Sequence, residues 1–168
     1  MLIKNFKNYD ISIFALIIFI IASRIIPHPH NFTPIISFAT MGYFLFKNQT
    51  RTIILTFIIM ITSDLILGFY ENVFYVYGSL FFIIIFFSQN KKYNYQNILI
   101  KGLLGSLIFF ISTNFCVWVF EDIYSKDLTG FLSCYFLALP FLENTLISTI
   151  LFNYIIFFIF KKRIINFP

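Results

Sequence analysis

The chain has 168 residues, of which 60% are hydrophobic and only 11% are charged, and its mean hydropathy is +0.88. Such values lie far outside the range of soluble proteins and indicate an integral membrane protein surrounded by a lipid bilayer. The formal net charge of +5 does not indicate a nucleic-acid partner, because the lysines and arginines stand in short clusters beside apolar runs, where they orient helices in a membrane.

The apolar segments predict an all-α integral membrane protein that forms one transmembrane domain, residues 1–168. A helix needs roughly 20 residues to cross the ~30 Å apolar core of a bilayer. Six segments approach this length, and in chain order they are 10–26, 34–46, 52–69, 73–88, 98–120 and 141–160. The second segment is short, so we expect it to be tilted or to cross only part of the membrane.

A further apolar stretch, residues 130–139, precedes the last predicted span. Together the two would form a helix too long for the bilayer. We therefore expect Pro140 to break the helix, because proline removes a backbone hydrogen bond, and to leave a short outer helix before the final span.

The distribution of charge predicts the orientation of this six-helix transmembrane bundle, because positive residues favour the cytoplasmic side. With the N-terminus inside, ten of the twelve lysines and arginines fall inside, and only Arg24 and Lys126 fall outside. The inner ten are Lys4, Lys7, Lys47, Arg51, Lys91, Lys92, Lys101, Lys161, Lys162 and Arg163. Both termini are therefore predicted to be cytoplasmic. Because most of the acidic residues then lie at or near the outer face, we expect the chemistry of the protein there.

The connection between the first two segments, SRIIPHPHNFTP, is unusually polar for this chain. Its three prolines disfavour helix at the residues before them and predict an extended, rigid connection over residues 26–33. Thr33 followed by Pro34 is typical of an N-cap and first turn, so the positive end of the second helix would point outward. Arg24 and His28 stand nearby and favour an anionic group there.

Two interpretations of this connection remain open. In the first, Arg24, His28 and Asn31 contact a ligand. In the second, the connection is a stiff loop in which Asn31 and the histidines only satisfy backbone groups.

The stretch MITSDLILGFY places Asp64 inside the outer half of the third span. A carboxylate there costs about 3 kcal/mol against lipid, so it requires a partner or a water-filled cavity. Arg24 is the expected counter-ion. The pair either only holds the first helix against the third or also lines a ligand cavity.

The stretch FFISTNFCVWVFED places Asn114 near the outer end of the fifth span, with Trp118 one turn beyond it. Asn114 is suited to hydrogen-bond a ligand on which Trp118 stacks; alternatively, they form an interhelical hydrogen bond and an interfacial aromatic belt. Cys116 and Cys134 both fall toward the outer side, where they either form a disulfide or remain small hydrophobic residues.

Glu143 and Asn144 follow Pro140 in the stretch CYFLALPFLENT. Both would lie at the outer end of the last span, at a depth similar to that of the other polar residues. Glu143 either faces a ligand or complements the helix dipole as a first-turn carboxylate.

The patterns RIIPHPHNFTP, SDLILG, TNFCVW and CYFLALPF together resemble an uncharacterised family of small bacterial integral membrane proteins, over roughly residues 20–155. That family usually has a proline where His30 stands and often a histidine where Tyr70 stands. The resemblance implies a location in the bacterial cytoplasmic (inner) membrane, and it implies no settled function.

More distantly, six helices in 19.9 kDa with an outward-facing polar cavity are similar to the substrate-binding S-components of energy-coupling-factor vitamin transporters. That similarity implies capture of a vitamin-like molecule at the outer side and a transmembrane coupling subunit with ATPases as a partner. The helix that docks on the coupling subunit often carries an A-x-x-x-A pattern, whereas here Ala15 and Ala22 stand seven apart.

The leading hypothesis is therefore the solute-binding component of a small-molecule uptake system, without enzymatic activity, cofactor or metal. Its predicted ligand-binding residues are Arg24, His28, Asn31, Asp64, Asn114, Trp118, Glu143 and Asn144. The chain has no Walker motif, so any energy for transport must come from another protein. The charge of the solute stays open, because Arg24 favours anions whereas Asp64 and Glu143 favour cations.

Two other classes of function remain. A membrane-embedded enzyme would use His28, Asp64 and Glu143 as metal ligands or acid–base groups, although the chain shows no H-E-x-x-H spacing. A structural or assembly protein would use the polar cluster only to lock helices together. An open polar pocket of several hundred cubic ångströms favours a ligand, whereas a packed, dry outer half favours a structural role.

Overall fold

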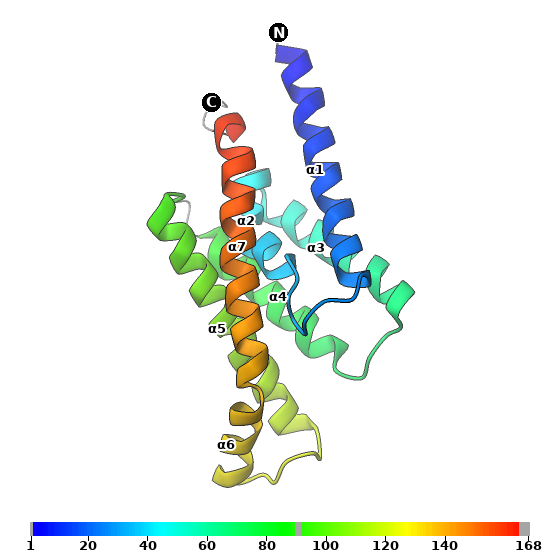
Figure 1. The fold of residues 1–168 in the computed structure, drawn as a ribbon, viewed down its shortest axis with the longest axis vertical. Helices are drawn as coiled ribbons and strands as arrows, with labels where there is room; N and C mark the ends of the chain where they lie inside the picture. The colour runs from blue at the N-terminus through cyan, green and yellow to red at the C-terminus, as the bar shows by residue number, and fades with distance from the viewer. Residues whose placement is uncertain (1, 90–91, 165–168) are drawn as a thin grey trace.

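The computed structural model describes residues 2–89 and 92–164, with side chains for residues 10–89 and 92–161. The described part contains seven helices and no strand, which confirms the prediction of an all-α chain (Figure 1). The helices are α1 (Leu2–Ile25), α2 (Ile35–Phe46), α3 (Gln49–Leu67), α4 (Val73–Ser88), α5 (Tyr95–Phe120), α6 (Leu128–Leu137) and α7 (Leu139–Ile164). Lys91, which entered the prediction of orientation, lies outside the described residues.

Each of the six predicted segments falls on a helix, but several helices begin earlier than the apolar runs. The reason is visible at α3 and α5, where polar residues form the first turn behind an asparagine cap. The side chain of Asn48 accepts a hydrogen bond from the backbone N–H of Arg51 at 2.9 Å, and that of Asn94 accepts one from Asn97 at 2.8 Å. Such caps satisfy the backbone N–H groups of the first turn. Because the capped turn is polar, hydropathy alone does not locate the start of the helix.

Within the described residues, three helices are long and apolar enough to cross a membrane: Gln49–Leu67, Tyr95–Phe120 and Leu139–Lys161. Helix α2 is apolar but has 12 residues, which rise only about 18 Å. Ten of these residues are buried, and α2 packs against α3, α4, α5 and α7. The second predicted span is therefore a central core helix that is shorter than the apolar thickness of a bilayer.

Polar side chains join α2 to α5 and α7 inside the core. The hydroxyl of Ser37 donates to the carbonyl oxygen of Thr149 at 2.9 Å, and that of Thr40 donates to Oδ1 of Asn153 at 2.9 Å. Nδ2 of Asn153 in turn donates to the carbonyl oxygen of Ile98 at 3.4 Å. Hydrogen bonds of this kind between helices fix their relative position where apolar contacts alone would let them slide.

The ends of the helices alternate so that one end of the molecule gathers the predicted polar residues. The two termini lie at the same end of the molecule (Figure 1). The C-terminal ends of α1, α3 and α5 and the N-terminal ends of α2, α4 and α7 lie toward the other end.

The short helix α6 and the start of α7 follow the predicted break. Helix α6 ends at Leu137, α7 begins at Leu139, and Pro140 lies in the first turn of α7, where it interrupts no backbone hydrogen bond. Asp127 caps α6: its Oδ1 accepts hydrogen bonds from the Gly130 N–H at 2.7 Å and the Ser125 hydroxyl at 2.8 Å. The Gly130 N–H, which is the larger cause, and the Ser125 hydroxyl both lower the pKa of Asp127.

Replacing Asp127 by alanine is expected to lower the melting temperature at neutral pH, because α6 loses its cap. A carboxyl whose pKa is lowered on folding stabilises the protein above its unfolded pKa, and this contribution is lost as the pH falls through the folded pKa. The melting temperatures of wild type and Asp127→Ala, measured in detergent, should therefore converge at acidic pH. Asp127→Asn is the control, because asparagine keeps a capping oxygen but has no group that titrates. The difference in melting temperature between Asp127→Asn and Asp127→Ala should therefore not depend on pH.

Candidate functional site

The expected ion pair between Arg24 and Asp64 is present. Arg24 lies in the last turn of α1, and its Nη2 lies 2.6 Å from Oδ1 of Asp64 in α3. The hydroxyl of Tyr77 donates to Oδ2 of Asp64 at 2.8 Å, and Nη1 of Arg24 contacts the sulfur of Met60. The side chains of Arg24 and Asp64 are only 11% and 1% exposed. Both carboxylate oxygens therefore have a partner, as a buried charge requires.

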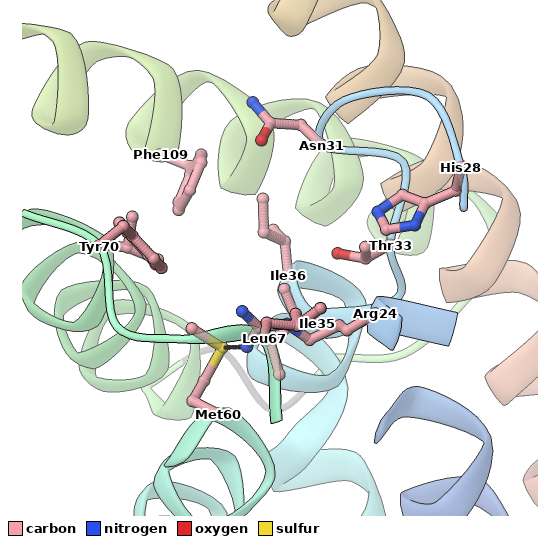
Figure 2. Close-up of a pocket in the computed structure, with 11 residues that line it drawn as sticks. Arg24, His28, Asn31, Thr33, Ile35, Ile36, Met60, Leu67, Tyr70 and Phe109 are labelled. Carbon is pink, nitrogen blue, oxygen red and sulfur yellow. Dashed lines mark hydrogen bonds between the residues drawn. The ribbon is translucent and has the colours of Figure 1, made fainter. Parts of the chain in front are cut away.

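A cavity of about 280 Å³, which we call the Arg24 lobe, lies beside this pair (Figure 2). Its polar wall consists of Arg24, His28, Asn31, Thr33 and Tyr70. Its apolar wall includes Ile35, Ile36, Leu67, Val76 and Phe109. Asp64 is not part of either wall, so the positive half of the ion pair faces the cavity and the negative half does not.

The loop between α1 and α2 brings His28 and Asn31 to this cavity. Nδ1 of His28 lies 2.7 Å from the carbonyl oxygen of Ile26 and must donate to it, which leaves Nε2 for another partner. The Phe32 N–H donates to the carbonyl oxygen of Pro29 at 3.0 Å, and Asn31 has a φ of 62°. The loop therefore contains a tight turn rather than the fully extended connection that its prolines predict. Asparagine is among the few residues that adopt this left-handed conformation readily.

The start of α2 also faces the Arg24 lobe, since Ile35 and Ile36 line it. The predicted N-cap at Thr33 is wrong: Pro34 occupies the cap position, and no side chain caps the helix. Proline has no hydroxyl to offer, and the backbone N–H groups of the first turn have no partner within the helix. The partial positive charge of this helix end is thus not neutralised by the chain's own cap.

A second cavity of about 250 Å³, the Asn114 lobe, adjoins the first, because Asn31, Tyr70, Val76 and Phe109 line both. Its further polar wall residues are Asn72, Tyr75, Thr113, Asn114 and Thr145. Asn114 donates from Nδ2 to the carbonyl oxygen of Phe110 at 2.8 Å, which leaves its Oδ1 and the second N–H of Nδ2 for other partners.

Among the wall residues that were not predicted as ligand-binding from the sequence, Asn72 and Tyr70 are the most informative. Oδ1 of Asn72 is buried without a hydrogen-bond partner, which is costly for an amide oxygen. Partial desolvation and the carboxylate of Asp64 raise the pKa of Tyr70, whereas the guanidinium of Arg24 beside its hydroxyl lowers it. Both residues stand in the connection from Gly68 to Asn72, directly after the helix that contains Asp64. Their proximity in sequence to an intramembrane carboxylate is the feature from which they could have been predicted.

Besides Asp64, three predicted residues line neither lobe. Trp118 donates from Nε1 to the carbonyl oxygen of Ser125 at 3.0 Å. This hydrogen bond holds the loop that leads to α6 against α5. Glu143 is exposed, and because α7 begins at Leu139 it lies beyond the first turn. Asn144 is half-buried beside it.

The remaining candidate chemistry concerns cysteines and metal ligands. Cys116 and Cys134 are free thiols, with Cys134 buried. Among the side chains that the structure describes, no group of three or more histidines, cysteines and acids could hold a metal ion. His28, Asp64 and Glu143 are therefore not brought together as a ligand set.

A family model described as "Family of unknown function (DUF6580)" matches residues 4–164. The chain belongs to the DUF6580 family. This agrees with the expectation, drawn from the four sequence patterns, of an uncharacterised family. Neither the curated proteins nor the solved structures that were compared with the chain gave a match.

Because DUF6580 has no known function, the chemistry must be argued from the two lobes. They place one guanidinium, one imidazole, an uncapped helix start and several neutral hydrogen-bonding groups around a partly open space. This DUF6580 site can hold a small molecule by hydrogen bonds and charge while its apolar wall contacts the rest of the molecule.

Proposed function

We propose that this DUF6580 protein is a multi-pass protein of the bacterial cytoplasmic membrane that binds a small, vitamin-like solute at the outer side for uptake. The observation that carries the proposal is the pair of adjoining cavities, each with polar groups in a largely apolar wall, at the meeting point of six helix ends. Intramembrane charge is expensive and is usually retained for binding or transport. The volume of each lobe, about 280 and 250 Å³, suits a small molecule or one part of it.

The surface of the protein supports insertion in a membrane. Large apolar side chains remain exposed along its helices, with Phe14 at 64%, Phe74 at 81% and Phe158 at 54% exposure. Water would disfavour such a surface, whereas lipid accepts it.

The proposed topology has six crossings and both termini in the cytoplasm. Lys47, Arg51 and Lys161 lie at the ends of helices opposite to the cavity, at the end that also holds the termini. Positive residues favour the cytoplasmic side, so the cavity would open outward. The short α6 then lies within one leaflet, whereas α2 connects the outer end of α1 to the inner end of α3 although it is shorter than the apolar core of the bilayer.

Transport would need a second protein, because the chain carries no nucleotide-binding motif. By analogy with S-components, this partner would be a transmembrane coupling subunit with ATPases.

A structural role is the second candidate function, and the ion pair itself favours it. Arg24 and Asp64 form a saturated pair between α1 and α3, and α1 has its principal packing contact with α3. A pair of this kind stabilises a bundle without any ligand. Both functions require the ion pair. Only the solute-binding function requires that a ligand occupies the cavity.

Thermal-shift screening of the detergent-purified protein against vitamins and their precursors tests the proposal. A compound that binds only the folded protein raises its melting temperature. In Val76→Phe, which places a larger side chain where both lobes meet, the shift should disappear. Val73→Phe, the same change on α4 outside both lobes, should keep it. A screen without any stabilising compound, or hits unaffected by Val76→Phe, would leave the structural role as the better explanation.

A further inference from the structure

The walls of the two lobes decide which charge a solute must carry. Arg24 and His28 are the cationic or protonatable basic residues of the Arg24 lobe, and no carboxylate lines either lobe. The sequence left the sign open because Asp64 and Glu143 favour cations. In the structure, both oxygens of Asp64 are occupied by Arg24 and Tyr77, and Glu143 is exposed on α7 outside the cavity.

The acids closest in sequence to the wall residues do not change this result. Glu71 is exposed beside Tyr70 and lines neither lobe. Glu121 accepts a hydrogen bond from the hydroxyl of Tyr75 at 3.1 Å and also lies outside the lobes. A cation in the cavity would therefore meet no carboxylate, whereas an anion would meet the guanidinium of Arg24.

An anion at the Arg24 end finds several donors. A guanidinium has five N–H groups; in Arg24 one donates to Asp64, one contacts Met60 and one donates to the hydroxyl of Tyr70, so two further N–H groups are available. The uncapped N–H groups at the start of α2 add to these donors. The ion pair is neutral overall, but the guanidinium of Arg24 faces the cavity. The anionic group of a ligand would be a second acceptor for its N–H groups, in addition to Asp64.

The Asn114 lobe has no cationic side chain in its wall. Oδ1 of Asn72 has no hydrogen-bond partner, and Asn114 keeps its Oδ1 as an acceptor and one N–H of Nδ2 as a donor. Apart from tyrosine hydroxyls, no ionisable group lines this lobe. A neutral N–H or O–H of a ligand can donate to these oxygens, whereas a second anionic group would find no cationic side chain in this wall.

We propose that the solute is a small organic anion whose acidic group binds in the Arg24 lobe and whose other end donates a neutral hydrogen bond in the Asn114 lobe. This inference rests on the proposed solute-binding function and adds the chemical class of the solute. Because Asn31, Tyr70 and Phe109 belong to both walls, the lobes adjoin, and the proposed solute extends past these residues from one lobe into the other.

Three probes of equal size test the sign of the charge: 4-hydroxybenzoate, 4-hydroxybenzamide and 4-hydroxybenzylamine, which are an anion, a neutral amide and a cation at neutral pH. Their dissociation constants for the full chain in detergent are measured by calorimetry and by thermal shift. The benzoate is expected to bind at least about tenfold more tightly than the amide, and the amine more weakly still. Equal or tighter binding of the amide or the amine would overturn the inference while leaving a solute-binding pocket in place.

If none of the three probes binds at millimolar concentration, the inference is likewise overturned. The proposed function is not decided by that result, because the screen with Val76→Phe and Val73→Phe tests it separately. The two proposals can therefore fail independently.

Two variants locate the contacts. In Arg24→Gln combined with Asp64→Asn, which removes both charges and keeps hydrogen-bonding amides, the preference for the benzoate over the amide should vanish. Asn31→Gly keeps the left-handed backbone and removes the carboxamide, so it should weaken all three probes while the melting temperature of the free protein stays the same.

The donor end has its own control. In wild type, 4-hydroxybenzoate should bind more tightly than benzoate, because its hydroxyl reaches Oδ1 of Asn72 or Asn114. In Asn72→Leu, the ratio of the dissociation constants of benzoate and 4-hydroxybenzoate should fall to about one. If the hydroxyl gives no advantage in wild type, the assignment of the donor to the Asn114 lobe is wrong.

Discussion

Asp64→Ala is expected to lower the free energy of unfolding by about 3–5 kcal/mol, the largest effect of any single substitution at the site. The variant leaves the guanidinium of Arg24, which is 11% exposed, without its carboxylate, and it also removes the acceptor of the Tyr77 hydroxyl. Thermal unfolding of the purified protein in detergent measures the loss.

The double variant Arg24→Met with Asp64→Leu separates stability from binding. Apolar residues of similar size can replace a buried ion pair with little or no loss of stability. We therefore expect the melting temperature of the double variant to return close to that of wild type, while binding of any compound from the screen is lost. Full stability together with full binding would show that the pair contributes only to the fold. If the double variant is as unstable as Asp64→Ala, packing around α1 and α3 rather than the unpaired charge explains the loss.

The ion pair could be predicted from the sequence because charged residues are rare within the apolar segments. Asp64 stands well inside the third segment and Arg24 at the outer end of the first, so each was the obvious partner for the other. Hydropathy also located the helices, since long apolar runs have few other solutions in a membrane protein. The asparagine caps at Asn48 and Asn94 account for the early starts of α3 and α5.

The central position of α2 could not be predicted in the same way. A helix in the core of a bundle and a helix that faces lipid are both apolar, so the composition of residues 35–46 fits either place. Only its length of 12 residues indicated that it is not an ordinary span.

The walls of the cavity were predicted in part, because loop residues take their direction from tertiary packing. Arg24, His28, Asn31 and Asn114 line the lobes, whereas Asn72 was not predicted. Trp118 stands one turn beyond Asn114, yet it contacts the α5–α6 loop through Ser125. Spacing along a helix gives the face of a side chain, but it does not tell which neighbouring loop covers that face.

Gly42→Ala is expected to destabilise the protein by about 1–3 kcal/mol or more, because α2 and α3 approach too closely for a methyl group. A Cβ atom at Gly42 would lie 2.0 Å from Cγ2 of Thr52, whose side chain is fully buried. Gly78→Ala is the matched control in α4: nothing lies within 4 Å of its added Cβ, so a gain of about 0.5–1 kcal/mol is expected from helix propensity.

The combination of Gly42→Ala with Thr52→Ser identifies the cause of the loss. Serine lacks the methyl group at 2.0 Å, although Oγ1 and Cβ of residue 52 would remain at 2.8 and 2.9 Å. Recovery of part of the lost stability is therefore expected, and no recovery at all would assign the loss to another contact. Because Ile35 and Ile36 at the start of α2 form a wall of the Arg24 lobe, a shift of this helix away from α3 also changes the cavity. Gly42→Ala should therefore weaken solute binding even though residue 42 does not line either lobe, whereas Gly78→Ala should leave binding unchanged.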